Sequence, residues 1–68
     1  MKIPNEIDNK MYEAHQRIWV GGMIVKKRFE DYKALTGDLD KLGYDTAEYH
    51  RLIGIIQKGI EERVKENL

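Results

Sequence analysis

Hydrophobic residues recur along the first half of the chain at steps of three and four positions, which is the spacing of one face of a helix. The positions on this face are Ile7, Met11, Ala14, Ile18, Gly21, Val25, Tyr32, Leu35 and Leu39. Arg28 is the one exception, a charged residue at a position of the series where an apolar residue is expected. Pro4 and the acidic Glu6 and Asp8 are typical of a helix start. The pattern therefore predicts a helix over residues 5–36.

Two adjacent glycines, Gly21 and Gly22, lie in the middle of this predicted helix. Each glycine costs a helix about 1 kcal/mol relative to alanine, so a break at the pair is one interpretation. The flanking residues 18–20 and 23–25 contain no turn residues, however, and the spacing keeps its phase across the pair. We therefore expect one unbroken helix in which the glycines let a second helix approach or leave space for a ligand.

A second helix is predicted over residues 46–67, after a polar connector over residues 37–45. Asp45 and Glu48 have the spacing of a capping box at the helix start. The apolar positions that follow are Tyr49, Ile53, Ile56, Ile60, Val64 and Leu68. The expected fold is all-α, an antiparallel helical hairpin that forms a single domain over residues 1–68.

The two predicted helices differ in length, at about 48 and about 33 Å, so part of the first has no partner within the hairpin. A domain of this size also buries only about 60% of its unfolded surface. We therefore expect the hairpins to assemble into a dimeric or higher helical bundle, a homo-oligomer. The residues expected at the oligomer interface are Ile7, Met11, Ala14, Ile18, Trp19, Gly21 and Gly22.

The charge balance argues against nucleic acid as the main partner. Twelve Lys and Arg residues balance twelve Asp and Glu residues, so the net charge at pH 7 is zero. The chain also lacks the run of about 20 apolar residues that a membrane-spanning helix needs, and it does not begin with an apolar signal core. We expect a cytoplasmic protein without a membrane partner.

Catalysis and metal binding are not expected either. The sequence has no cysteine and no serine, so it offers neither a Cys-based zinc site nor a serine nucleophile. His15 and His50 have no further histidine or cysteine within a helical turn. The series Asp38, Asp40 and Gly43 resembles the start of a calcium loop, but the later ligand positions do not fit. We expect no enzyme activity, no cofactor and no bound metal.

Candidate binding residues come from the aromatic and basic side chains. Arg28 lies on the apolar face, where a guanidinium needs a partner or a ligand. Tyr12 with Lys26 or Arg28 would form an aromatic face and a cation for a nucleotide if a second protomer contributes. Tyr12 at an oligomer rim is the alternative interpretation.

The stretch Ile56-Gln57-Lys58-Gly59-Ile60 resembles the apolar-Gln-x-Gly-apolar stretch in the last helix of a phage family. These small helical proteins sequester cyclic nucleotides and so block CBASS immunity. The resemblance implies an all-helical, oligomeric, non-enzymatic protein that sequesters a small phosphate-bearing ligand such as a cyclic oligonucleotide. In this hypothesis Tyr12 stacks on a base, Lys26 and Arg28 bind phosphates, and Gly59 gives clearance.

Two other functions remain open. One is a protein-interaction module that acts as a small regulator or inhibitor of a host protein. The other is an RNA- or DNA-binding helical bundle that uses Lys26, Lys27 and Arg28.

Overall fold

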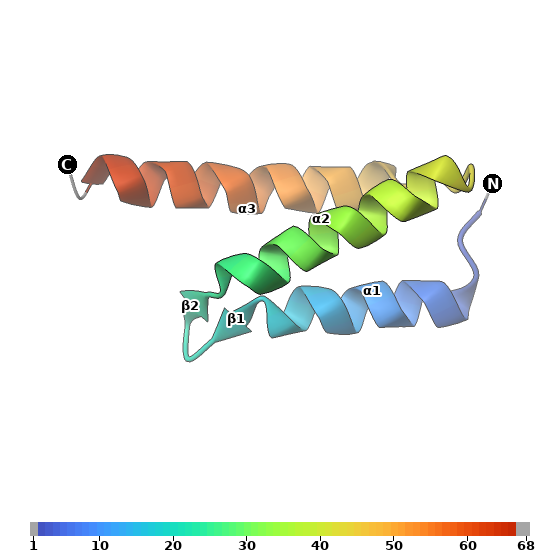
Figure 1. The fold of residues 1–68 in the computed structure, drawn as a ribbon, viewed down its shortest axis with the longest axis horizontal. Helices are drawn as coiled ribbons and strands as arrows, with labels where there is room; N and C mark the ends of the chain where they lie inside the picture. The colour runs from blue at the N-terminus through green and yellow to red at the C-terminus, as the bar shows by residue number, and fades with distance from the viewer. Residues whose placement is uncertain (1, 67–68) are drawn as a thin grey trace.

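The computed structural model describes residues 2–66, with side chains for residues 2–63. Within them the chain forms the helices α1 (Asn5–Arg17), α2 (Lys26–Lys41) and α3 (Ala47–Glu66), and the short strands β1 (Trp19–Val20) and β2 (Met23–Ile24). Helices α1 and α3 run in the same direction, and α2 runs back between them (Figure 1). The predominantly helical fold is confirmed, but residues 2–66 form three helices and a small sheet instead of a two-helix hairpin.

The predicted continuous helix over residues 5–36 is wrong, because a β-hairpin divides it. Trp19 pairs with Ile24 and Val20 pairs with Met23, which leaves the two glycines as a two-residue loop. Both have positive φ angles, +59° at Gly21 and +79° at Gly22, as a type I′ hairpin turn requires. The aromatic and β-branched residues beside the loop favour extended backbone.

The glycine pair is not a crossing point between helices of this chain. A Cβ atom added at either glycine would meet no atom within 4 Å. The two glycines therefore serve the backbone conformation of the turn.

The predicted connector over residues 37–45 is also misplaced, because α2 continues through Gly37 to Lys41. Gly43, two residues after the helix end, has a φ of +84° and terminates the helix. The Gly43 N–H donates to the Asp40 carbonyl at 3.1 Å, and the Tyr44 N–H donates to the Leu39 carbonyl at 3.2 Å. These two bonds form a Schellman motif, so the connector comprises residues 42–46.

Asp40 fastens the connector to the start of α3. One of its carboxylate oxygens accepts a hydrogen bond from the Thr46 hydroxyl, and the other lies 2.7 Å from His50 Nε2. These contacts, with Thr46 the larger cause, lower the pKa of Asp40. The Asp45 carboxylate accepts the Ala47 N–H at 3.3 Å, so α3 begins one residue after the predicted start. Residue 67, the predicted helix end, lies outside the described residues.

The core lies where the three helices meet. Its buried hydrophobic residues are Met11, Ile18, Phe29, Tyr32, Leu39, Tyr49 and Ile56, with Ile7 and Ala14 partly buried against them. The expectation that part of the first predicted helix has no partner within the chain is therefore wrong for Ile7, Met11 and Ala14. Because α1 ends at Arg17, α2 folds back along it and covers this segment.

The expectation of a homo-oligomer rests partly on a segment of the first predicted helix without a partner, which the structure shows packed against the core. The homo-oligomer itself stays a prediction. Within residues 2–66 every helix is too short or too polar to cross a bilayer.

Candidate functional site

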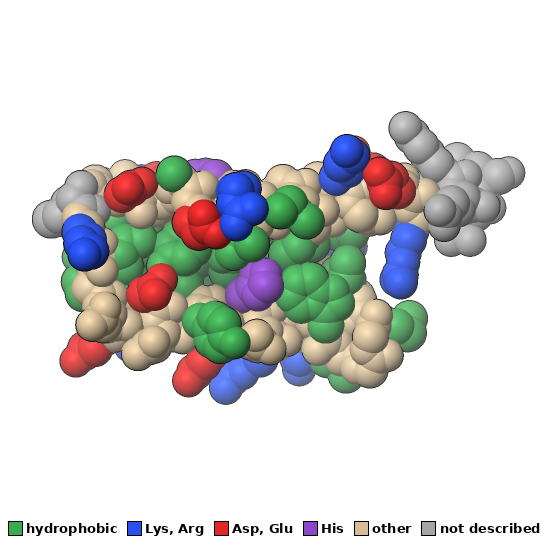
Figure 2. All heavy atoms as spheres, turned by 180° about the vertical axis from the view of Figure 1, so that it is seen from behind, with side chains coloured by type: hydrophobic (Ala, Val, Ile, Leu, Met, Phe, Trp, Pro, Cys, Tyr) green, Lys and Arg blue, Asp and Glu red, His purple; other side chains and the backbone are tan. Residues whose placement is uncertain are grey.

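A groove runs between α1 and α3 on the face shown in Figure 2, where hydrophobic side chains gather between the two helices. It consists of two adjoining hollows, which share Asp8, Glu48 and Tyr49. We call it the α1–α3 groove. The hollow nearer the amino end of the chain is the outer hollow, and the one nearer the middle of the helices is the inner hollow.

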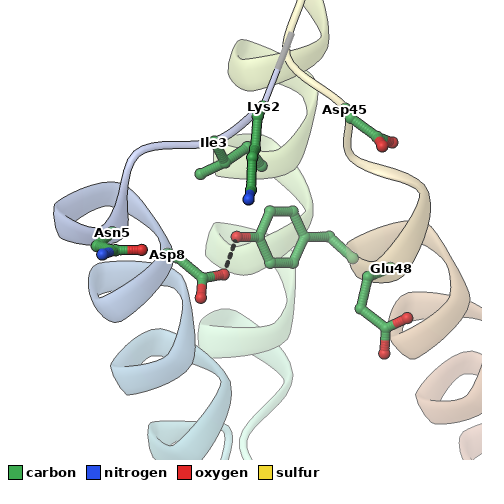
Figure 3. Close-up of a pocket in the computed structure, with 7 residues that line it drawn as sticks. Lys2, Ile3, Asn5, Asp8, Asp45 and Glu48 are labelled. Atoms are coloured by element: carbon green, nitrogen blue, oxygen red, sulfur yellow. Dashed lines mark hydrogen bonds between the residues drawn. The ribbon is translucent and has the colours of Figure 1, made fainter.

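The outer hollow has a volume of about 590 Å³ and is rich in carboxylates. Its lining residues are Lys2, Ile3, Asn5, Asp8, Asp45, Glu48 and Tyr49 (Figure 3). The Tyr49 hydroxyl donates to Asp8 Oδ1 at 2.5 Å, the bond drawn as a dashed line in Figure 3. This bond ties α3 to α1 across the groove. Three carboxylates and one ammonium group line the outer hollow, so it attracts cations more than anions.

The inner hollow is smaller, about 220 Å³, and aromatic. Its lining residues are Asp8, Met11, Tyr12, His15, Tyr32, Glu48, Tyr49 and Leu52. The rings of Tyr32 and Tyr49 meet edge to face, with centroids 6.4 Å apart at 88°. His15 meets Tyr32 at 5.8 Å and Trp19 at 4.9 Å, again edge to face. This chain of rings connects all three helices and holds the wall of the inner hollow in place.

The electrostatics of the inner hollow are negative at neutral pH. Burial, together with the nearby charges of Glu48 and Asp8, raises the pKa of Tyr32 to about 12. Burial also raises the pKa of Tyr49, which the hydrogen bond to Asp8 reinforces. Burial lowers the pKa of His15, so its ring is uncharged at pH 7. Two carboxylates therefore face the inner hollow, and none of its lining residues is a cation at pH 7.

Tyr32 contributes a hydroxyl that has no partner in the described part of the chain. The side chain is 1% exposed, yet it lines the inner hollow. No hydrogen bond among the described residues involves its hydroxyl, and no buried side-chain oxygen is shut off without a partner. The hydroxyl oxygen therefore remains accessible, and the residue that carries it lines the inner hollow.

Beyond the inner hollow the groove continues as an exposed apolar surface. Ile55 lies one turn after Leu52 on α3 and is 57% exposed, while Tyr12 and Trp19 from the α1 side are 64% and 37% exposed. We call Tyr12, Trp19, Leu52 and Ile55 the apolar strip. Grouped apolar exposure beside a hollow is typical of an interaction site, whereas isolated exposed residues are common on any surface.

The structure does not bring the four predicted ligand residues together. Tyr12 lines the inner hollow, whereas Arg28 lines a separate hollow of about 280 Å³ with Ala14, Arg17 and Asp31. Lys26 is exposed at the first residue of α2, and Gly59 is partly buried on α3. Neither Lys26 nor Gly59 lines any of the three hollows.

Arg28 has a partner of its own within the chain. Its Nη1 donates to the Arg17 carbonyl at 3.0 Å, at the carboxyl end of α1. A cation is favourable there because unpaired carbonyl groups concentrate negative charge at a helix end. The polar residue at an apolar position is thus explained by the break between the two helices.

The predicted interface residues fall into two groups. Met11 and Ile18 are buried in the core, and Ile7 and Ala14 are partly buried beside them. Trp19, Gly21 and Gly22 belong to the exposed β-hairpin. Of these residues, Trp19 is in the apolar strip.

Sequence reasoning missed Asp8, Glu48, Tyr32 and Tyr49 as site residues. A signal for part of the site was present, because Asp8, Tyr12, His15 and Trp19 follow one another at steps of four, three and four. Glu48, Leu52 and Ile55 repeat the same spacing on α3. Asp8, Tyr12 and His15 mark one face of α1, the second series marks one face of α3, and the two faces flank the groove.

The described side chains bring no three potential metal ligands together. Comparisons with protein-family models, curated proteins and solved structures give no match for this chain.

Proposed function

We propose that the chain is a protein-interaction module that binds a basic amphipathic helix of a partner protein in the α1–α3 groove. The observation that carries this proposal is the exposed apolar strip directly beside a hollow with two carboxylates, Asp8 and Glu48, on its wall. Binding of a helix in an apolar groove is a recurring mode of peptide recognition. The partner helix would complete a four-helix arrangement with α1 and α3 as its neighbours.

The geometry of α3 suits a helical partner. Glu48, Leu52 and Ile55 lie at positions i, i+4 and i+7, so they span about 10 Å along one face. A partner helix with apolar residues at the same spacing would place them against Leu52, Ile55 and Trp19. Burial of such side chains is worth roughly 1.5–3 kcal/mol each before the cost of association.

The charge of the groove supports a basic partner. The outer and inner hollows together contain the carboxylates of Asp8, Asp45 and Glu48 and the ammonium group of Lys2. Arg51 pairs with Glu48 at 2.5 Å on the exposed side, which leaves three negative charges against two positive ones. Lysine and arginine beside the apolar face of a partner would therefore be attracted, and acidic residues repelled.

The groove gives less support to the cyclic-nucleotide hypothesis. A phosphate in either hollow would meet Asp8 and Glu48, while Lys26 and Arg28 lie outside both. Sequestration between protomers stays a prediction that requires a second chain to bring cations to Tyr12.

Trp19 is the single tryptophan and reports on the groove, so binding is measurable by its fluorescence. The probe is an alanine-rich helical peptide of about 20 residues with leucines at i, i+4 and i+7 and flanking arginines. A second peptide carries glutamates in place of the arginines. We expect saturable binding of the arginine peptide, and binding at least about tenfold weaker for the glutamate peptide.

The matched variants are Ile55→Glu, in the apolar strip, and Leu42→Glu, at a residue of similar exposure (65%) outside both hollows. Ile55→Glu should abolish binding and Leu42→Glu should leave it unchanged. Equal binding of both peptides, or equal loss in both variants, would contradict the proposal. So would a dimer of the free protein that Ile55→Glu converts to a monomer, because a second copy would then occupy the groove.

A further inference from the structure

We propose that the inner hollow is an anchor site for one arginine side chain of the partner helix. This inference rests on the proposed function and adds the residue type that the groove selects. Its basis is the combination of an aromatic wall, two carboxylates and the unpaired, accessible hydroxyl of a buried tyrosine around one small hollow.

The size of the inner hollow favours a single side chain. Its volume of about 220 Å³ lies below the roughly 300–1,000 Å³ of typical small-molecule sites. A side chain delivered by a docked helix needs no larger site, because the apolar strip next to the hollow supplies the remaining contact area.

The polar groups of the hollow match the donors of a guanidinium. Asp8 uses Oδ1 to accept the Tyr49 hydroxyl, and its other oxygen remains available within the same wall. Glu48 lines the hollow from the opposite helix, where Arg51 already donates one hydrogen bond to each of its oxygens, and the Tyr32 hydroxyl is a further acceptor on a residue that lines the hollow. A guanidinium carries five N–H donors in one plane, so it is able to bond to several of these oxygens at once.

The aromatic groups explain why arginine fits better than lysine. The planar guanidinium stacks on aromatic faces and is more weakly hydrated than an ammonium group, so it loses less on entering a partly buried site. Tyr12 is 64% exposed at the rim, where its ring is free to cover an incoming side chain. His15 is uncharged at pH 7 and so does not repel the cation.

The test compares two helical peptides that differ at one position. Both peptides have leucines at i, i+4 and i+7. At the position one helical turn before the first leucine, the first peptide has arginine and the second has citrulline, its neutral isostere. The affinity of each is measured by Trp19 fluorescence for the wild-type protein and for the double variant Asp8→Asn/Glu48→Gln. Asparagine keeps an acceptor for the Tyr49 hydroxyl, and circular dichroism checks that the variant is folded.

We expect the arginine peptide to bind the wild-type protein about tenfold more tightly than the citrulline peptide, since hydrogen bonds between charged groups are the strong ones. The preference should vanish in the double variant and weaken in Tyr32→Phe, which keeps the ring and removes the hydroxyl. The control Asp38→Asn, at an exposed carboxylate that lines neither hollow, should keep the full preference.

Failure of the anchor and failure of the docking groove give different results. Equal affinity of the two peptides for the wild-type protein, with both lost in Ile55→Glu, would overturn the arginine anchor and leave the groove in place. A preference that survives in the double variant would also overturn the anchor. Absence of binding by either peptide would overturn the proposed function together with the anchor.

Discussion

Replacing Gly22 with alanine distinguishes the β-hairpin from an unbroken helix by the sign of its effect. In the hairpin Gly22 has a φ of +79°, a conformation that costs an L-residue roughly 1–2 kcal/mol. In a continuous helix the same substitution would stabilise the protein by about 1 kcal/mol. An added Cβ meets nothing within 4 Å, so no clash obscures the difference.

The measurement is thermal unfolding followed by circular dichroism. A loss of 1 kcal/mol lowers the Tm of a domain of this size by about 4–8 °C. The Tm of Gly22→Ala should therefore lie below that of the wild-type protein by at least that much. Gly54→Ala is the control, because Gly54 lies inside α3, is exposed and also has open space at its Cβ. It should gain up to about 1 kcal/mol.

Chemical synthesis allows a second control, since D-alanine prefers the positive φ that Gly22 adopts. Gly22→D-Ala should therefore be at least as stable as the wild-type protein. A higher Tm for Gly22→Ala, or a lower one for the D-alanine variant, would refute the hairpin.

Three further predictions concern polar contacts. Tyr49→Phe removes the hydroxyl that donates to Asp8, and urea unfolding should show a loss of about 1 kcal/mol with an unchanged m-value. The hydrogen bonds that Asp40 accepts across the connector lower its pKa, so their stabilisation is complete above its ordinary pKa of 3.8. That stabilisation is lost as the pH falls from 3.8 through the lowered pKa. In Asp40→Asn the free energy of unfolding, measured at several pH values, should lack this pH-dependent loss. Arg28→Ala removes the donor to the Arg17 carbonyl and should cost about 0.5 kcal/mol in the same urea assay, whereas no change would contradict its helix-capping role.

The helical content and the second long helix were predictable because their signals are local. The apolar spacing from Tyr49 to Ile60 and the polar residues before Ala47 indicate α3 within one residue of its observed start. The extent of α2 was harder to predict because a glycine does not end a helix when residues beyond it still pack in the core, as Leu39 does here. Gly37 lies inside α2, and the helix ends at Lys41, just before Gly43, where the Schellman hydrogen bonds form.

The hairpin was missed because its spacing imitates a helix. Ile18 and Val25 are seven residues apart, which is one heptad of a helical face. In the structure they are close for another reason, since the hairpin folds back and the Val25 N–H donates to the Ile18 carbonyl at 2.7 Å. Two glycines between β-branched and aromatic residues are a hairpin signal, and that signal outweighs the periodicity here.

Part of the groove was predictable and part was not. The series from Asp8 to His15 lies on α1, with Trp19 just beyond its end, and can be recognised in the sequence. The inner hollow also needs Tyr32 and Tyr49, which come from two other helices. Their position depends on how α2 folds back after the hairpin. The predicted two-helix fold lacks this turn, and therefore it does not bring Tyr32 and Tyr49 next to Tyr12.

The central claim is that the α1–α3 groove binds a basic helix, and nuclear magnetic resonance of isotope-labelled protein tests it most directly. On titration with the arginine-bearing helical peptide, saturable shift changes should concentrate on the residues of the groove, namely Asp8, Tyr12, His15, Trp19, Glu48, Leu52 and Ile55. Changes centred instead on residues 26–28, or no saturable change at all, would contradict the claim.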